Sequence, residues 1–121
     1  MALFCTDLMF LVQLQNMAKK AGLRYVAVRP GAALPAARLL VVDLSSRGDV
    51  QAAIKEGVER GMRVVAFGPH MDAEGRRAAK AVGASRVLAN SNLSRDLPLV
   101  LAALHEGAAD GTDDSTITED D

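Results

Sequence analysis

The sequence has 121 residues, a net charge of −1 and one cysteine, and half of its residues are hydrophobic. This length favours one domain with its own core. A single cysteine excludes an internal disulfide framework and is typical of a reducing compartment. No apolar run approaches the roughly 18 residues of a membrane-spanning helix, and no basic segment precedes the apolar N-terminus. We therefore expect a soluble cytoplasmic protein.

The charge is distributed unevenly along the chain. Residues 110–121 contain six acidic residues and no basic one, so the rest of the chain carries a net positive charge. A polar, acidic segment of this kind buries little apolar surface, and we expect a disordered tail over 108–121 after a single domain over 1–107. The tail has two interpretations: a solubilising end, or a segment that folds over the basic body and competes with an acidic partner.

The N-terminal part of the sequence predicts a strand followed by a helix. Residues 2–5 are apolar and predict the first strand. Thr6 or Asp7 is placed to cap a helix over 8–21, in which apolar residues recur at helical spacing. These apolar residues form a broader stripe than one buried face needs, so the helix either packs fully against the sheet or offers a partner surface.

The next segment predicts the strand around which the fold is organised. A second strand is expected over 24–29, and the prolines after it leave room only for a short helix over 32–38. The run Leu-Leu-Val-Val-Asp-Leu at 39–44 predicts a central strand buried on both faces of a parallel sheet. Asp43 near its end is expected at the carboxyl edge, where open α/β sheets bind ligands.

The second half of the chain continues the same alternation. We expect a helix over 50–60, a strand over 63–68, a helix over 73–82, a strand over 86–89 and a helix over 97–106. Asp49 and Asp72 are placed as N-caps, and Pro98 is placed in the first turn of the last helix. Five strands alternating with five helices predict a doubly wound parallel sheet with right-handed crossovers.

In order, length and loop residues, these segments resemble the receiver domain of bacterial response regulators. The best markers are the run at 39–44, the run Val-Val-Ala-Phe-Gly-Pro-His-Met-Asp at 64–72 and Val-Gly-Ala at 82–84. The resemblance covers roughly residues 2–106 and implies a flavodoxin-like (βα)5 fold with strand order 2-1-3-4-5. It also implies a role in signal transduction of the phosphorelay type.

The resemblance places Asp43 at the position of the aspartate that accepts a phosphoryl group. The family's acidic pair, which holds magnesium, matches Cys5-Thr6-Asp7, so Asp7 alone remains to hold a metal weakly with Asp43. Gly68 stands where the family has a hydroxyl residue, and Asn90 where it has a lysine. Phosphoryl transfer needs cations on the transferring oxygens. We therefore predict a degenerate receiver that needs no cofactor and in which Asp43 is not phosphorylated.

Three functional hypotheses remain open. In the first, the chain is a stand-alone pseudo-receiver, not an enzyme, that acts through contacts with a protein partner or as a homodimer. Its candidate surfaces are the helix over 8–21 and a face formed by Arg76, Arg77, Lys80 and Arg86. In the second, Asp43 is an atypical phosphoacceptor. In the third, the loops Thr6-Asp7, Ser45-Ser46 and Gly68-Pro69-His70 bind a small ligand. Nucleic acid is disfavoured as a partner because aromatic stacking groups are nearly absent.

Overall fold

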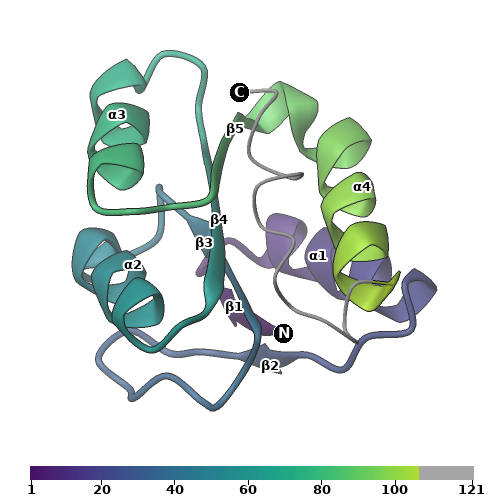
Figure 1. The fold of residues 1–121 in the computed structure, drawn as a ribbon. Coiled ribbons are helices and arrows are strands. Elements are labelled where there is room, and N and C mark those ends of the chain that lie inside the picture. The colour runs from purple at the N-terminus through teal and green to yellow at the C-terminus, as the bar shows by residue number, and fades with distance from the viewer. Residues whose placement is uncertain (107–121) are drawn as a thin grey trace.

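The computed structural model describes residues 1–106 and contains the five-stranded parallel sheet that the sequence predicts (Figure 1). The strands lie in the order β2-β1-β3-β4-β5, and each neighbouring pair is parallel. This order defines the doubly wound receiver or flavodoxin-like fold, so the predicted fold class is confirmed. The acidic tail expected over 108–121 lies outside the described residues.

The elements follow the predicted alternation. The strands are β1 (Ala2–Phe4), β2 (Val26–Ala27), β3 (Leu39–Asp43), β4 (Arg63–Gly68) and β5 (Arg86–Ala89). The helices are α1 (Leu8–Lys20), α2 (Val50–Glu59), α3 (Ala73–Ala81) and α4 (Leu93–Glu106), with a 3₁₀ turn, η1 (Asn90–Asn92), before α4. Within residues 1–106, none of these helices combines the length and the apolar character needed to cross a membrane.

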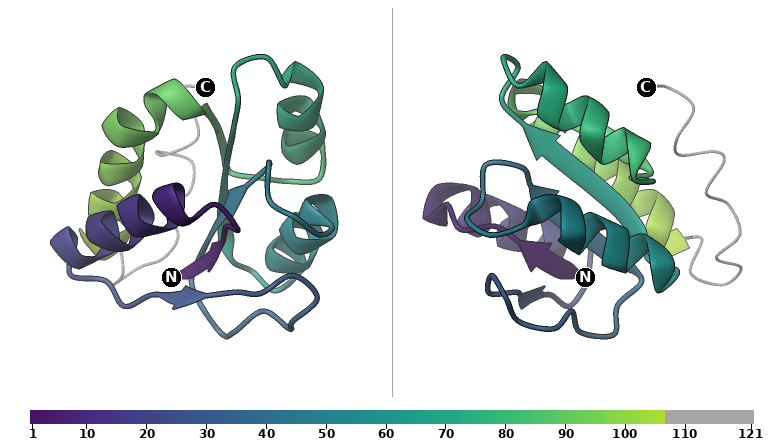
Figure 2. Two further views of the ribbon diagram at one scale, coloured as in Figure 1. Left: turned by 180° about the vertical axis from the view of Figure 1, so that it is seen from behind. Right: turned by 90° about the vertical axis from the view of Figure 1, so that its left-hand side faces the viewer.

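Two apolar layers enclose the sheet. Helices α1 and α4 cover one face, and α2 and α3 cover the other (Figures 1 and 2). Successive residues of β3 alternate between the layers: Leu39 and Val41 belong to the core under α1 and α4, and Leu40 and Val42 to the core under α2 and α3. Because both faces are covered, β3 is an uninterrupted apolar run, as parallel strands require.

The N-terminal ends of three helices are fixed by carboxylates. The side chains of Asp7, Asp49 and Asp72 accept hydrogen bonds from backbone N–H groups in the first turns of α1, α2 and α3, as predicted. Each aspartate directly follows a strand or its loop at the carboxyl edge. The caps therefore fix the direction in which each helix leaves this edge.

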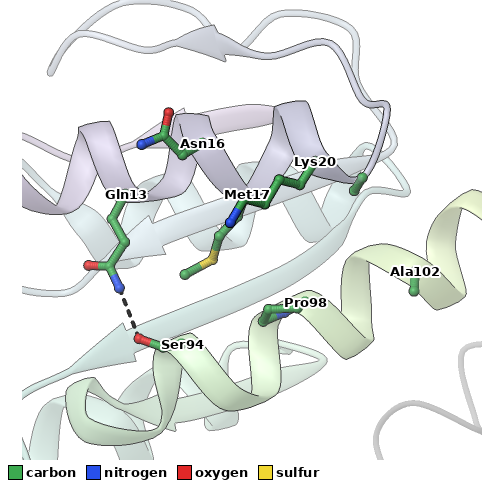
Figure 3. A pocket seen from close by; sticks show the side chains of 8 residues that line it. Gln13, Asn16, Met17, Lys20, Ser94, Pro98 and Ala102 are labelled. Carbon is green, nitrogen blue, oxygen red and sulfur yellow. Dashed lines mark hydrogen bonds between the residues drawn. The ribbon is translucent and has the colours of Figure 1, made fainter.

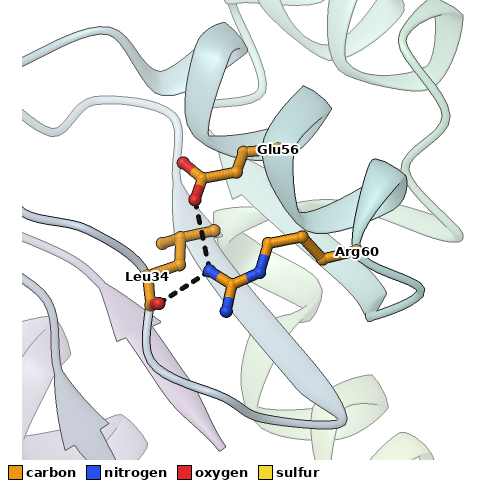
Figure 4. Close-up of polar contacts among 3 residues, drawn as sticks. All are labelled: Leu34, Glu56 and Arg60. Atoms are coloured by element: carbon orange, nitrogen blue, oxygen red, sulfur yellow. Dashed lines mark hydrogen bonds and ion pairs between the residues drawn. The ribbon is translucent and has the colours of Figure 1, made fainter.

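The short helix expected over 32–38 is wrong, because this segment is irregular. It packs on the α2 side of the sheet, where Leu34 is buried. Arg60 at the end of α2 satisfies its backbone: Nη1 donates to the Leu34 carbonyl at 2.7 Å and lies 3.2 Å from Glu56 Oε2 (Figure 4). A side chain therefore supplies the hydrogen bond that a helical turn would otherwise provide, and Pro35 disfavours that turn.

Two predicted boundaries also shift. The second strand is limited to Val26–Ala27, an exposed edge strand with only β1 beside it. The last helix begins at Leu93 rather than at residue 97, because Leu93 is fully buried against the sheet. Pro98 consequently lies inside α4 and not in its first turn. Because proline has no backbone N–H, α4 lacks the hydrogen bond that position 98 would otherwise donate.

Candidate functional site

Asp43 ends β3 beneath the carboxyl-edge surface of the sheet. Only 1 % of its surface is exposed. Its Oδ1 accepts a hydrogen bond from the Ser45 N–H at 2.9 Å. The Cys5 thiol has two acceptors for its single proton, Asp43 Oδ2 at 3.5 Å and the Asp7 carbonyl at 3.4 Å. Burial raises the pKa of Asp43, and the nearby charge of Asp7 raises it further, whereas the hydrogen bonds from Ser45 and Cys5 oppose this rise. The carboxyl is therefore enclosed and biased toward its neutral form.

Two loops are bonded to each other beside Asp43. The Thr6 N–H donates to Ser46 Oγ at 3.2 Å, and the Arg47 N–H donates to Thr6 Oγ1 at 3.1 Å. Ser46 Oγ also donates to the Phe4 carbonyl at 3.4 Å. These contacts join the loop after β1 to the loop after β3. We call this part of the carboxyl edge, around Asp43, the Asp43 rim, and its polar groups bond to one another.

The residues beside Asp43 offer few groups to a magnesium ion. Asp7 Oδ1 caps α1, accepting from the N–H groups of Met9 at 2.9 Å and Phe10 at 3.2 Å. Cys5 contributes a thiol whose pKa is raised by burial to about 12, so it stays protonated at neutral pH. Among residues 1–106, no group of three or more His, Cys, Asp or Glu residues could hold a metal. Magnesium is usually held through one or two carboxylates together with water and phosphate oxygens, and here Asp7 Oδ1 is already used as the cap of α1.

Gly68 ends β4 against a large side chain. A Cβ atom at this position would lie 3.2 Å from Cδ1 and 3.3 Å from Cβ of Leu44. Leu44 thus occupies the space into which a hydroxyl-bearing side chain would project. A hydroxyl-bearing side chain at position 68 would therefore need Leu44 to shift by a few tenths of an ångström.

Asn90 follows β5, the strand that pairs with β4 up to Gly68 and Ala89. Within residues 1–106, its Oδ1 is buried without a hydrogen-bond partner. An uncharged carboxamide cannot neutralise phosphoryl oxygens as the family's lysine does. The resemblance singles out four positions, and all of them lie at the carboxyl edge: Asp7, Asp43, Gly68 and Asn90.

The predicted cationic face is present in part. Arg76, Arg77 and Lys80 line a shallow cleft of about 420 Å³ beside Val87. Lys80 Nζ donates to the Ser85 carbonyl at 3.3 Å. Arg86 differs, because only 6 % of its surface is exposed and it belongs to the buried part of β5. Its charge acts instead on Asp96 of α4, whose pKa it helps to lower after the larger effect of Arg95.

The start of α1 exposes apolar side chains. Leu8 is 74 % exposed and Met9 is 84 % exposed, whereas Leu14 and Ala18 are buried against the sheet. The helix therefore packs through one stripe and leaves a second apolar stripe on the surface. The broad apolar pattern of the sequence left such an exposed surface open as one of two alternatives.

A cleft of about 610 Å³ lies between α1 and α4, away from the Asp43 rim (Figure 3). Its lining residues are Gln13, Asn16, Met17, Lys20, Ala21, Ser94, Pro98 and Ala102. Gln13 Nε2 donates to Ser94 Oγ at 2.9 Å and joins the two helices at one end of the cleft. The cleft is not expected from the sequence alone, because the predicted helix over 97–106 leaves out Ser94.

Comparisons of the fold identify its structural class. No protein-family model and no curated protein matches the sequence. RcsB from Salmonella enterica serovar Typhimurium, solved bound to the promoter rprA with a phosphomimetic, is similar with a TM-score of 0.69 and 18 % identity. The match covers 85 % of this chain and 66 % of RcsB.

Two further structures give the same result. A response regulator from Burkholderia pseudomallei with a phosphorylated aspartic acid matches with a TM-score of 0.66 and 16 % identity, covering 98 % of this chain and 73 % of that protein. The phosphorylated cyanobacterial phytochrome response regulator RcpA matches with a TM-score of 0.64 and 14 % identity, covering 90 % and 92 %. The chain thus has the fold of response-regulator receiver domains.

Proposed function

We propose that the chain is a non-enzymatic, receiver-like signalling module of the cytoplasm that acts through protein contacts, without phosphorylation of Asp43. The observation that carries this proposal is the burial of Asp43, which is 1 % exposed and hydrogen-bonded to Ser45 and Cys5. Phosphoryl transfer requires an ionised carboxylate oxygen in line with the donor. Asp43 is enclosed by its neighbours, and its burial disfavours the charged form that would attack phosphorus.

The surroundings of Asp43 support the same conclusion. An aspartyl phosphate carries negative charge on its phosphoryl oxygens and needs nearby cations or donors. Receivers carry a hydroxyl residue, a lysine and an acidic pair around the phosphoacceptor. This chain has Gly68, Asn90 and Asp7 at the matching positions, and Asp7 already caps α1. Signalling by this module therefore depends on its surfaces and not on a covalent switch.

The test is exposure of the full chain to acetyl phosphate with magnesium, followed by intact-mass measurement. In a reactive receiver, a carboxylate oxygen attacks phosphorus, an aspartyl phosphate forms and acetate leaves. We expect no gain of a phosphoryl group and no amide shift near Asp43 when beryllofluoride and magnesium are added. A mass gain that disappears in Asp43→Asn would overturn the proposal and support an atypical phosphoacceptor. Asp49→Asn, which alters a cap elsewhere, serves as the matched variant.

The contact surface that we assign is the cationic cleft of α3. Arg77 and Lys80 are exposed, Arg76 is half-buried, and Ala73 and Val87 supply an apolar floor. Two copies of the same cationic surface would repel each other in a symmetric dimer. An acidic protein segment is therefore a better occupant than a second copy of this face.

An acidic peptide probe tests this surface. Titration with a decapeptide of alternating Glu and Leu is expected to shift the amides of α3, with an affinity that falls as salt is raised. The double variant Arg76→Glu/Arg77→Glu should abolish the shifts. The matched variant Arg29→Glu/Arg38→Glu, at two exposed positions away from α3, should leave them unchanged. Equal loss in both variants would show only nonspecific attraction to the basic body and would overturn the assignment.

A further inference from the structure

The cleft between α1 and α4 has the dimensions of a small-molecule site. Its volume of about 610 Å³ falls within the range of roughly 300–1,000 Å³ that is typical of ligand pockets. Its apolar walls are formed by Met17, Ala21, Pro98 and Ala102. The polar lining residues are Gln13, Asn16, Lys20 and Ser94. Small residues on α4 leave the space open.

Pro98 removes one helical hydrogen bond beside this cleft. In an α-helix the N–H of residue i+4 bonds to the carbonyl of residue i, but proline has no N–H. The carbonyl of Ser94 therefore receives no hydrogen bond from position 98 of α4. Ser94 and Pro98 both line the cleft and both are exposed. A ligand N–H group is suited to this carbonyl.

Lys20 provides the single charge of the cleft lining within the described residues. Its side chain runs back along α1 toward Met17, so the ammonium group lies over the middle of the cleft (Figure 3). Gln13 and Lys20 are seven positions apart, which corresponds to about 10 Å along the helix axis. The backward direction of Lys20 shortens the distance between the cationic group and the Ser94 end.

We propose that the α1–α4 cleft binds a small amphipathic carboxylate with an N–H donor, of the N-acyl amino acid class. The carboxylate pairs with Lys20, and the amide N–H bonds to the carbonyl of Ser94. The acyl chain covers Met17 and Pro98. Each part of this ligand thus has a complementary group in the cleft lining. The site is separate from the Asp43 rim.

The test is an amide NMR titration of the full chain with N-octanoylglycine. The expected result is a saturable set of shifts at Gln13, Lys20, Ser94 and Ala102, without shifts at Asp43. The methyl ester lacks the carboxylate and octanoic acid lacks the N–H, so both should bind several-fold more weakly. Lys20→Gln should reproduce the loss seen with the ester and bind acid and ester alike.

A cleft-filling variant makes the test specific. Ala102→Leu places a larger side chain on an exposed position of the lining and should weaken binding about tenfold. Ala78→Leu makes the same change at an exposed position of α3 and should leave binding unchanged. No saturable binding at millimolar probe, shifts centred elsewhere, or equal affinity in Ala102→Leu would overturn the proposal. Absence of binding would leave a helix of a protein partner as the better occupant.

Discussion

The Asp43 rim and the α1–α4 cleft use their polar groups in opposite ways. At the rim, polar groups bond to one another: Asp43 accepts from Ser45, and the Thr6 N–H donates to Ser46. In the cleft, the Ser94 carbonyl lacks its helical donor, and Lys20 lies over open space. The rim is held by several hydrogen bonds within the chain, although Asn90 Oδ1 has no partner within residues 1–106, whereas the cleft pairs Gln13 with Ser94 and leaves the side chain of Lys20 exposed.

The difference shows why fold and chemistry need separate arguments. The receiver fold brings Asp43 to the carboxyl edge, where related folds carry out their reaction. The local sequence then encloses this residue, because Cys5 donates a weak hydrogen bond and Leu44 fills the space before Gly68. Recognition in this chain is expected at surfaces that the fold leaves open, since function resides in sites and not in folds.

The largest predicted effect comes from restoring bulk at the rim. In Gly68→Thr the new Cβ would lie 3.2 Å from Leu44 Cδ1, and overpacking of this kind costs about 1–3 kcal/mol of the free energy of unfolding. Part of this cost is offset because threonine is favoured in strands. Urea unfolding measures the difference. An unchanged free energy of unfolding would show that the space beside Leu44 accommodates threonine. The rim would then not differ from the cleft in available space.

A double-mutant cycle provides the control. Leu44→Ala removes the side chain that a Cβ at position 68 would meet, so Gly68→Thr should cost less in that background. A coupling of roughly 0.5–3 kcal/mol is typical of residues in direct contact. Additive effects of the two substitutions would mean that Leu44 does not limit the space before Gly68.

Most of the fold was predictable because the dominant signals are local. The apolar run of β3 and the aspartate caps of α1, α2 and α3 follow directly from sequence patterns. The irregular segment before β3 was not predictable, since its stability depends on Arg60, 26 positions from Leu34 in sequence. The early start of α4 depends likewise on the burial of Leu93 in the sheet core.

The position of Asp43 was predictable from the sequence, but its enclosure was not. The end of β3 placed Asp43 correctly, and Asp7 was one of two candidate caps. Its enclosure depends on contacts between loops about 40 residues apart, such as Thr6 with Ser46, which no local pattern encodes. Alternation along β5 gives one signal for the burial of Arg86, because it shares a face with the buried Leu88.

The smallest predicted effect is a pH dependence of the free energy of unfolding that comes from Asp43 at the rim. The carboxyl of Asp43 has a folded-state pKa above its ordinary value of 3.8 because burial disfavours the charged form. The folded state therefore binds more protons than the unfolded state between the ordinary and the raised pKa. The free energy of unfolding contributed by this group falls as pH rises through that window, and the loss persists above it.

Asp43→Asn should remove this pH dependence while its carboxamide oxygen keeps the hydrogen bond from the Ser45 N–H. We expect the variant to gain stability relative to the wild type as pH rises from below the ordinary carboxyl pKa through the raised pKa of Asp43. Urea midpoints of both proteins across this range measure the difference, which cancels the contributions of other carboxylates. Lys20→Gln, a substitution in the lining of the cleft and away from Asp43, serves as the comparison variant. A constant difference for Asp43→Asn would mean that the rim is open to water, as the cleft is.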